Sequence, residues 1–250
     1  MVFIYSLDDF NTFGFLQILI TASLLLSPIF TLGVRGVILR FFPYFKDTPE
    51  QRAAFLSFAI LTGFCGITVL GLVGNFVILP LLDQFESSEN NVQVYIRFAY
   101  YIYCITAIQI LIEILDFYIQ NFRRVTVQTI FTNLLPKLTM GALVFLTYKF
   151  GFDLEIVAIT VVGMNLVILL CLLAYLNHLK ELRLTWKIGI HFSPRMRREI
   201  FDFALFAILG TLGNKLVLQI DTISLGTLTD EQTVGIFRFV AFAAGVIDIP

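Results

Sequence analysis

The chain has 250 residues, of which 58% are hydrophobic and only 14% charged, with a formal net charge of -1. An ordinary soluble domain carries about 25% charged residues, so this composition argues against a soluble globular protein. Near-neutral charge without a basic stripe of interleaved aromatic residues gives no indication of nucleic-acid binding. The apolar residues come in long blocks, which is typical of a polytopic membrane protein.

The apolar blocks are long enough to cross a bilayer as helices. Ala53–Leu82 has thirty residues without Asp, Glu, Lys or Arg, whereas about 20 suffice for one span. Continuous apolarity favours helices over barrel strands, in which apolar and polar residues alternate. The sequence therefore predicts an all-α transmembrane bundle of seven spans. They are Phe13–Val34, Ala53–Leu82, Phe98–Ile119, Val127–Tyr148, Leu154–Leu176, Phe201–Gly226 and Val234–Pro250.

Basic residues alternate between the predicted loops, and this pattern predicts the orientation of the chain. The first, third and fifth loops hold twelve of the 17 Lys and Arg residues, so the positive-inside rule makes these loops cytoplasmic. The opposite loops are acidic. The twelve basic residues are Arg35, Arg40, Lys46, Arg52, Arg123, Arg124, Lys180, Arg183, Lys187, Arg195, Arg197 and Arg198.

This orientation divides the chain into three parts. Residues 1–178 are expected to be the helices of a first bundle, and the outside N-terminus favours a preceding opening helix, with a short translocated N-terminal tail as the alternative. Residues 179–200 form the longest loop, where Trp186 among cations favours a cytoplasmic amphipathic linker on the inner leaflet, with a solvated linker as the alternative. Ser193 and Pro194 are a cap and a first-turn proline for the next helix. Residues 201–250 are expected to begin a second, truncated bundle.

Ionisable groups inside the predicted spans are the candidate functional residues, because each is costly in hydrocarbon. Lys137 and Lys215 lie far from either end of their spans. A buried ammonium suits an anionic group in transit, and the alternative is a permanent ion pair with a carboxylate on another helix. The other charges, Asp202, Arg238 and Asp248, lie near predicted helix ends and are expected to reach the interface.

Three carboxylates are candidates for coupling. Glu113 and Asp116 are one helical turn apart, so they could share a proton, or they could pair with the basic residues of the third loop. Asp221 and Asn214 lie on one face of the sixth span, and Lys215 and Gln219 lie on another. A helix with two polar stripes is expected to border a hydrated cavity.

Other features of the sequence exclude several classes of function. The outer loops span about 7 to 15 residues and hold no His, no Ser/His/Asp set and no metal-ligand spacing, so we expect neither an enzyme nor a metal site. A phosphate-binding loop is also missing. Six Gly residues of the second and sixth spans are expected to allow close helix contacts, and such glycines also allow a helix to bend. They are Gly63, Gly66, Gly71, Gly74, Gly210 and Gly213.

Three separated motifs resemble those of bacterial polysaccharide-biosynthesis flippases. The first is LGVRGVILRFFPYFKD at Leu32–Asp47, and the second is NLLPKL at Asn133–Leu138. The third is QIDTI at Gln219–Ile223, followed by VGIF at Val234–Phe237 and by IDIP at the C-terminus. In this order the motifs cover most of the chain. The chain therefore resembles the oligosaccharide-lipid flippases of the multidrug/oligosaccharidyl-lipid/polysaccharide exporter superfamily.

The resemblance implies a transporter of twelve to fourteen helices in two bundles, of which this chain would hold the second to the eighth. It also implies that an undecaprenyl-pyrophosphate-linked repeat unit moves across the bacterial inner membrane by alternating access, for assembly of surface polysaccharide. Lys137, Lys215, Arg35 and Arg40 would contact the substrate, although the two arginines could instead be positive-inside anchors.

The resemblance also implies how the transporter works with other molecules. We expect coupling to protons or sodium through Asp221, Glu113 and Asp116, with no bound cofactor. The expected partners are the lipid-linked oligosaccharide, membrane lipids, a polysaccharide polymerase and glycosyltransferases. Two alternatives remain open at this stage, a multidrug or metabolite exporter of the same superfamily and a non-transporting scaffold for glycan assembly.

Overall fold

A computed structural model gives the fold of the chain. It describes residues 7–78, 80, 90–122, 130–136, 138–139, 142–143, 154–185, 193–229 and 231–247. The described residues are helical or in short connections, which confirms the predicted all-α class. The long helices are α1 (Leu7–Phe30), α3 (Pro49–Val73), α5 (Asn90–Gln120), α8 (Leu154–His178), α9 (Pro194–Leu228) and α10 (Glu231–Ile247).

Shorter elements connect these helices. Helix α2 (Val34–Phe41) and the 3-10 turn η1 (Phe42–Tyr44) follow α1, and the π-helical turns η2 (Gly74–Ile78) and η3 (Ile130–Leu134) follow α3 and α5. Half of the predicted span 127–148 lies outside the described residues. Lys137 lies outside them too, and so does the linker from 186 to 192.

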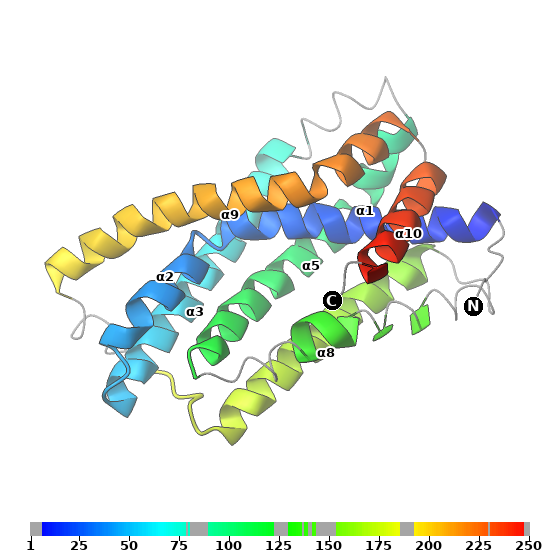
Figure 1. The fold of residues 1–250 in the computed structure, drawn as a ribbon. Helices are drawn as coiled ribbons and strands as arrows, with labels where there is room; N and C mark the ends of the chain where they lie inside the picture. Colours follow the sequence, from blue (N-terminus) through cyan, green and yellow to red (C-terminus); the bar gives the residue numbers. More distant parts are fainter. Residues whose placement is uncertain are drawn as a thin grey trace.

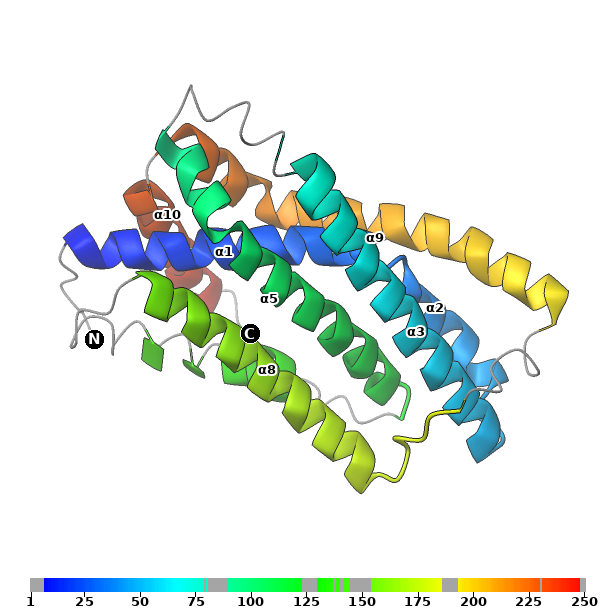
Figure 2. The same ribbon diagram turned by 180° about the vertical axis from the view of Figure 1, so that it is seen from behind.

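The helices form one packed body in which α3, α5 and α8 lie side by side (Figure 2). Helix α1 crosses this layer, and α9 packs against α1 and α2 on the other side (Figure 1). Helix α10 packs on α1 and returns along the end of α9. The segment expected to begin a second bundle therefore packs directly on the first helices of the chain.

Four of the described helices are long and apolar enough to cross a membrane, and a bent pair would make a fifth. The four are Pro49–Phe76, Phe98–Gln120, Leu154–His178 and Pro194–Val217. They agree with the predicted second, third, fifth and sixth spans, with helix ends displaced by a few residues. This finding establishes an all-α polytopic membrane protein. Helix α10 has 17 residues, as many as the predicted seventh span, but it begins and ends three residues earlier, at Glu231 and Ile247.

The predicted first span, 13–34, does not form one straight helix. Helix α1 ends at Phe30, and the segment from Val34 to Tyr44 is bent by 58° from it. Leu32 and Gly33 have positive φ values of 51° and 71°, the left-handed conformation that ends many helices. A Cβ at position 33 would also overlap the backbone of Ala204 in α9. Glycine is thus required here both by the turn and by the approach of α9.

Helices α3 and α9 begin where short sequence signals place them. The hydroxyl of Thr48 accepts a hydrogen bond from the amide of Gln51 at 3.3 Å, and Pro49 occupies the first turn of α3. Ser193 accepts from the amide of Met196 at 3.2 Å, with Pro194 in the same role. These caps satisfy amides that would otherwise lack partners. The predicted start of α9 is confirmed, and it lies within the expected linker 179–200.

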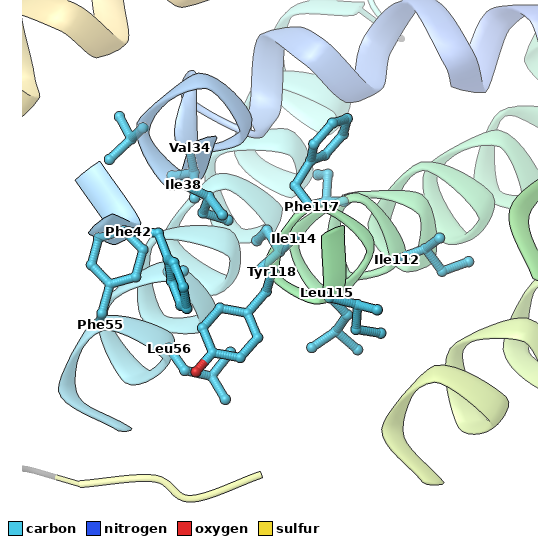
Figure 3. Packing of buried hydrophobic residues seen from close by; sticks show 14 of the residues in the cluster. Val34, Ile38, Phe42, Phe55, Leu56, Ile112, Ile114, Leu115, Phe117 and Tyr118 are labelled. Carbon is cyan, nitrogen blue, oxygen red and sulfur yellow. The ribbon is translucent and has the colours of Figure 1, made fainter. Parts of the chain in front are cut away.

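The main hydrophobic core joins α2, α3 and α5 through aromatic rings. Phe42 contacts Tyr118 and Phe122 edge to face, each at 5.4 Å between ring centres. Phe55 stacks on Phe45 at 4.9 Å. Figure 3 shows the side chains of Phe42 from η1, Phe55 from α3 and Tyr118 from α5 close together. Edge-to-face pairs favour such packing beyond the area that they bury.

The glycine prediction holds for only half of its residues. A Cβ at Gly66 would overlap the backbone of Phe30, and side chains of α5 crowd Gly63 and Gly74 in the same way. At Gly71, Gly210 and Gly213, however, a Cβ would meet open space. The prediction of close helix contact is therefore wrong for these three glycines, because their faces lie on the outside of the packed body.

Candidate functional site

The candidate site is a row of charged and polar side chains where α9 meets α5, α1 and α10. Its centre is the pair of Lys215 on α9 and Glu113 on α5, with Nζ and Oε1 3.8 Å apart. Both side chains are largely buried, with exposed fractions of 19% and 11%. The sequence left open whether Lys215 serves a substrate or an ion pair, and the structure places it beside a carboxylate.

Neither partner of this pair is fully satisfied by the other. A distance of 3.8 Å is an ionic contact but too long for a hydrogen bond. Oε2 of Glu113 is buried and has no hydrogen-bond partner among the described residues. Buried polar atoms normally have such a partner, so an orphaned carboxylate oxygen marks a position for water, a proton or a ligand. Asp116 is one turn further along α5 and is also buried.

A second cluster continues the row one turn further along α9. Gln219 shares the face of Lys215 at i, i+4, and its Oε1 accepts a hydrogen bond from the guanidinium of Arg238 on α10. The same guanidinium lies 3.4 Å from the hydroxyl of Thr21 on α1. Asp221 also interacts electrostatically with Arg238. Three helices therefore meet at one arginine.

Arg238 was predicted to lie near a helix end and to reach the membrane interface, and this prediction is wrong. In the structure α10 begins at Glu231, so Arg238 lies in the middle of the helix and is half-buried among its partners. An earlier helix start could have been inferred from Asp230 and Glu231, since acidic residues favour the first turn of a helix. Asp248, the remaining charge of this predicted span, lies outside the described residues.

The two predicted polar stripes of α9 have different surroundings. Lys215 and Gln219 face neighbouring helices, whereas Asn214 and Asp221 are exposed on the outer side of α9. Only the first stripe lies inside the packed body. The second stripe lies on a face of α9 that is exposed in this structure.

The arginines of α2 lie against aromatic rings. The guanidinium of Arg35 lies 4.2 Å from the centre of the Phe117 ring of α5. Arg40 lies 4.5 Å from the ring of Phe203 on α9. Cation–π contacts of this kind hold the guanidinium plane while leaving its edge donors available.

Arg40 shares its surroundings with carboxylates. A pocket of about 280 Å³ between α2 and α9 is lined by Arg40, Glu199 and Asp202 among other residues. Asp202 is exposed, as expected for a residue near a helix end. The two carboxylates offset the charge of Arg40 in this pocket, as Glu113 offsets that of Lys215.

The structure does not bring all the predicted substrate contacts to one point. Arg40 lies at Phe203, and Lys215 is twelve residues further along α9, which corresponds to about 18 Å of helix. Arg35 lies at the Asp116–Phe117 end of α5, and Lys215 lies at Glu113. The described candidates therefore form an extended row along α9 and its neighbours, with alternating signs of charge.

An extended row of this kind suits a large, polar and charged ligand better than a compact reaction centre. The arrangement offers ammonium and guanidinium donors for anionic groups and carboxylates that can hold a proton or a cation. All of these groups are carried by helices of a membrane-spanning bundle. The fold and site together define a polytopic membrane protein with a charged interior.

The family of the chain follows from comparison with known proteins. The polysaccharide biosynthesis protein family matches residues 10–248. The chain therefore belongs to this family, which the three motifs of the sequence had indicated. No curated protein and no solved structure matches the chain. Membership agrees with a membrane protein that takes part in polysaccharide biosynthesis.

Proposed function

We propose that this protein is a flippase for lipid-linked oligosaccharides. It would carry an undecaprenyl-pyrophosphate-linked repeat unit from the inner to the outer leaflet of the bacterial inner membrane, for assembly of surface polysaccharide. Translocation needs no covalent step, so the protein would act as a transporter and not as an enzyme. The proposal rests on one observation above all, a buried Lys215–Glu113 pair inside a membrane bundle of this family.

In the proposed cycle Lys215 has two alternative partners. Without substrate its ammonium is held by Glu113. When the pyrophosphate enters, Lys215 exchanges the carboxylate for phosphate oxygens, with Arg35 and Lys137 as further cationic contacts and Arg40 at the far end of the row. Because charges are costly in hydrocarbon, each must keep an opposite charge or water beside it. Exchange of partners meets this requirement in both states.

The released Glu113 gives a route for coupling. Glu113 can take up a proton or a sodium ion when Lys215 leaves it, and its orphaned Oε2 gives the position. Asp116 would pass the ion on, and Asp221 would receive it on the outer face of α9. Binding of the ion at Glu113 and of the substrate at Lys215 would then be thermodynamically linked, because both require the same ion pair to open.

Complementation of a strain that lacks the gene tests this proposal, with variants that separate structure from transport. Lys215→Ala and Glu113→Gln are compared with the exchanged pair Glu113→Lys/Lys215→Glu. Controls are Lys180→Ala and Glu155→Gln, because both side chains are exposed in the structure. Protein levels are matched by blot. The readouts are surface polysaccharide and accumulation of lipid-linked repeat units.

The proposal predicts that the exchanged pair restores the protein level but not transport, because the ammonium then lies on the wrong helix for the substrate. Precursor should accumulate in each variant of the pair and not in either control. Lys137→Ala should also accumulate precursor at a normal protein level. If the exchanged pair restores surface polysaccharide fully, the pair is structural and a scaffold role is favoured. Loss of small-cation efflux with normal polysaccharide would instead indicate a drug or metabolite exporter.

A further inference from the structure

A second cavity, outside the charged row, lies between α2, α3 and α9. Its volume is about 410 Å³, within the range of small-molecule sites. Val37 of α2, Phe58 of α3 and Ile208 of α9 are among its apolar lining residues. An almost wholly apolar cavity does not hold ordered water, because water needs polar partners. Its natural occupant is therefore a hydrocarbon group.

The surroundings of this cavity limit the source of that group. Helices α3 and α9, which form two of its walls, are both long and apolar enough to cross a membrane. In the bilayer the neighbouring medium is lipid, whose chains are available at high concentration without any separate delivery. A cavity walled by membrane spans is therefore expected to fill with a lipid chain.

One end of the cavity is cationic. Arg197, in the first turn of α9 and exposed, is among the lining residues, and Arg198 is exposed beside it. The amides at the start of α9 add partial positive charge at the same end. A guanidinium matches a phosphate group with two parallel hydrogen bonds. An apolar cavity with a cationic end is complementary to an amphiphile whose head is an anion.

We propose that this cavity is a binding site for an anionic glycerophospholipid, with one acyl chain between α2, α3 and α9 and the phosphate at Arg197. The lipid would fill the space beside the Gly33 turn, where α2 already touches α9 at Ala204. It would thereby hold α9 against the bent α1–α2 pair. The site is separate from the charged row and does not depend on the proposed transport function.

Native mass spectrometry of the detergent-solubilised full-length protein tests this site. The protein is titrated with palmitoyl-oleoyl phosphatidylglycerol and with phosphatidylcholine of the same chains, so that only the headgroup differs. We expect phosphatidylglycerol to bind at least tenfold more tightly. Arg197→Gln should weaken phosphatidylglycerol at least fivefold, the scale of one basic residue near an anionic lipid surface. It should leave phosphatidylcholine unchanged.

A pair of neighbouring substitutions tests the chain pocket. Ile208→Trp fills the cavity and should weaken both lipids about tenfold, whereas Leu209→Trp, on the exposed side of α9, should change neither more than twofold. Arg198→Gln is the matched control for the headgroup, with less than a twofold effect expected. Thr62→Leu, which adds less volume inside the cavity, replaces Ile208→Trp if that variant does not fold.

Three outcomes would overturn the proposal. Equal affinity of the wild type for both lipids, or equal effects of Ile208→Trp and Leu209→Trp, would remove the site. Displacement of phosphatidylglycerol by undecaprenyl phosphate that binds more than tenfold tighter would assign the cavity to the prenyl chain instead. No lipid-linked oligosaccharide is present in this assay, so its failure and failure of transport are distinguishable.

Discussion

Helices α5 and α9 are both apolar enough to span a membrane, yet they occupy opposite environments. Of the most apolar 18-residue window of each helix, 61% is buried inside the protein in α5 and 6% in α9. Helix α5 packs between α3, α8 and α1, whereas α9 lies along the outside of α1 and α2. Mean apolarity therefore does not tell an interior helix from a peripheral one in this protein. The positions of the few charges are more informative, since Glu113 and Asp116 of α5 are buried and α9 turns only one polar stripe inward.

The largest contrast is expected from truncating an aromatic ring in each environment. Phe55→Ala removes a fully buried ring of the aromatic core and should lower the free energy of unfolding by about 3–5 kcal/mol. Phe206→Ala on α9, where the side chain is 74% exposed, should change it by less than about 0.5 kcal/mol in detergent. SDS titration followed by circular dichroism measures both. Equal losses would mean that α9 is covered in the folded protein.

The ion pair joins the two environments and gives the next largest effect. Glu113→Ala leaves a buried ammonium without its partner and should cost about 3 kcal/mol of unfolding free energy. Removal of both charges in Glu113→Leu/Lys215→Met should recover most of this loss, because hydrophobic pairs replace buried ion pairs well. The double-mutant cycle, measured by the same titration, gives the coupling energy. Additive effects of the two single changes would show that the side chains do not interact.

Two glycines inside long helices, Gly66 on a packed face and Gly213 on an exposed face, test the same difference in environment with smaller expected effects. Gly66→Ala forces a Cβ against the backbone of Phe30 and should destabilise the protein by about 1–3 kcal/mol. Gly213→Ala meets open space and should stabilise it by up to about 1 kcal/mol through helix propensity. Thermal unfolding of the two variants in one detergent measures the difference. Effects of the same sign would contradict the packing of α1 on α3.

The smallest effects are expected at the helix caps, which should stabilise a buried and a peripheral helix equally. Thr48→Ala and Ser193→Ala each remove a side-chain cap, from α3 and α9 respectively. Each should cost about 1 kcal/mol, because a cap acts on its own first turn whatever the helix packs against. Loss of helical circular dichroism on heating measures both variants. A much larger effect at Ser193 would indicate that the start of α9 contributes more to stability than the start of α3 does.

Sequence predicted the fold class and most of the spans because their signals are local. Continuous apolar blocks define α3, α5, α8 and much of α9, and a Ser or Thr followed by Pro marks the starts of α3 and α9. The bend after α1 was not predicted, since a single Gly in an apolar block is ambiguous. Only the approach of α9 to Gly33 distinguishes a turn from a continuing helix.

The candidate site was predicted in part, because a charge within an apolar block is also a local signal of the sequence. Charges within apolar blocks singled out Glu113, Lys215 and Asp221 without any knowledge of packing. Their partners depend on how distant helices meet, so the pairing of Glu113 with Lys215 and the junction at Arg238 could not be predicted from spacing. The roles of these residues in substrate binding and coupling remain predictions.

Transport itself is tested most directly by reconstituting the full-length protein in vesicles with a fluorescent lipid-linked oligosaccharide. Quenching by a membrane-impermeant reagent then reports the rate at which the substrate changes leaflet. The account predicts rapid exchange with the wild type and at least tenfold slower exchange with Glu113→Gln at equal incorporation, because the uncharged side chain no longer exchanges partners with Lys215. Exchange by the wild type no faster than in protein-free vesicles would contradict the proposed transport of lipid-linked oligosaccharide.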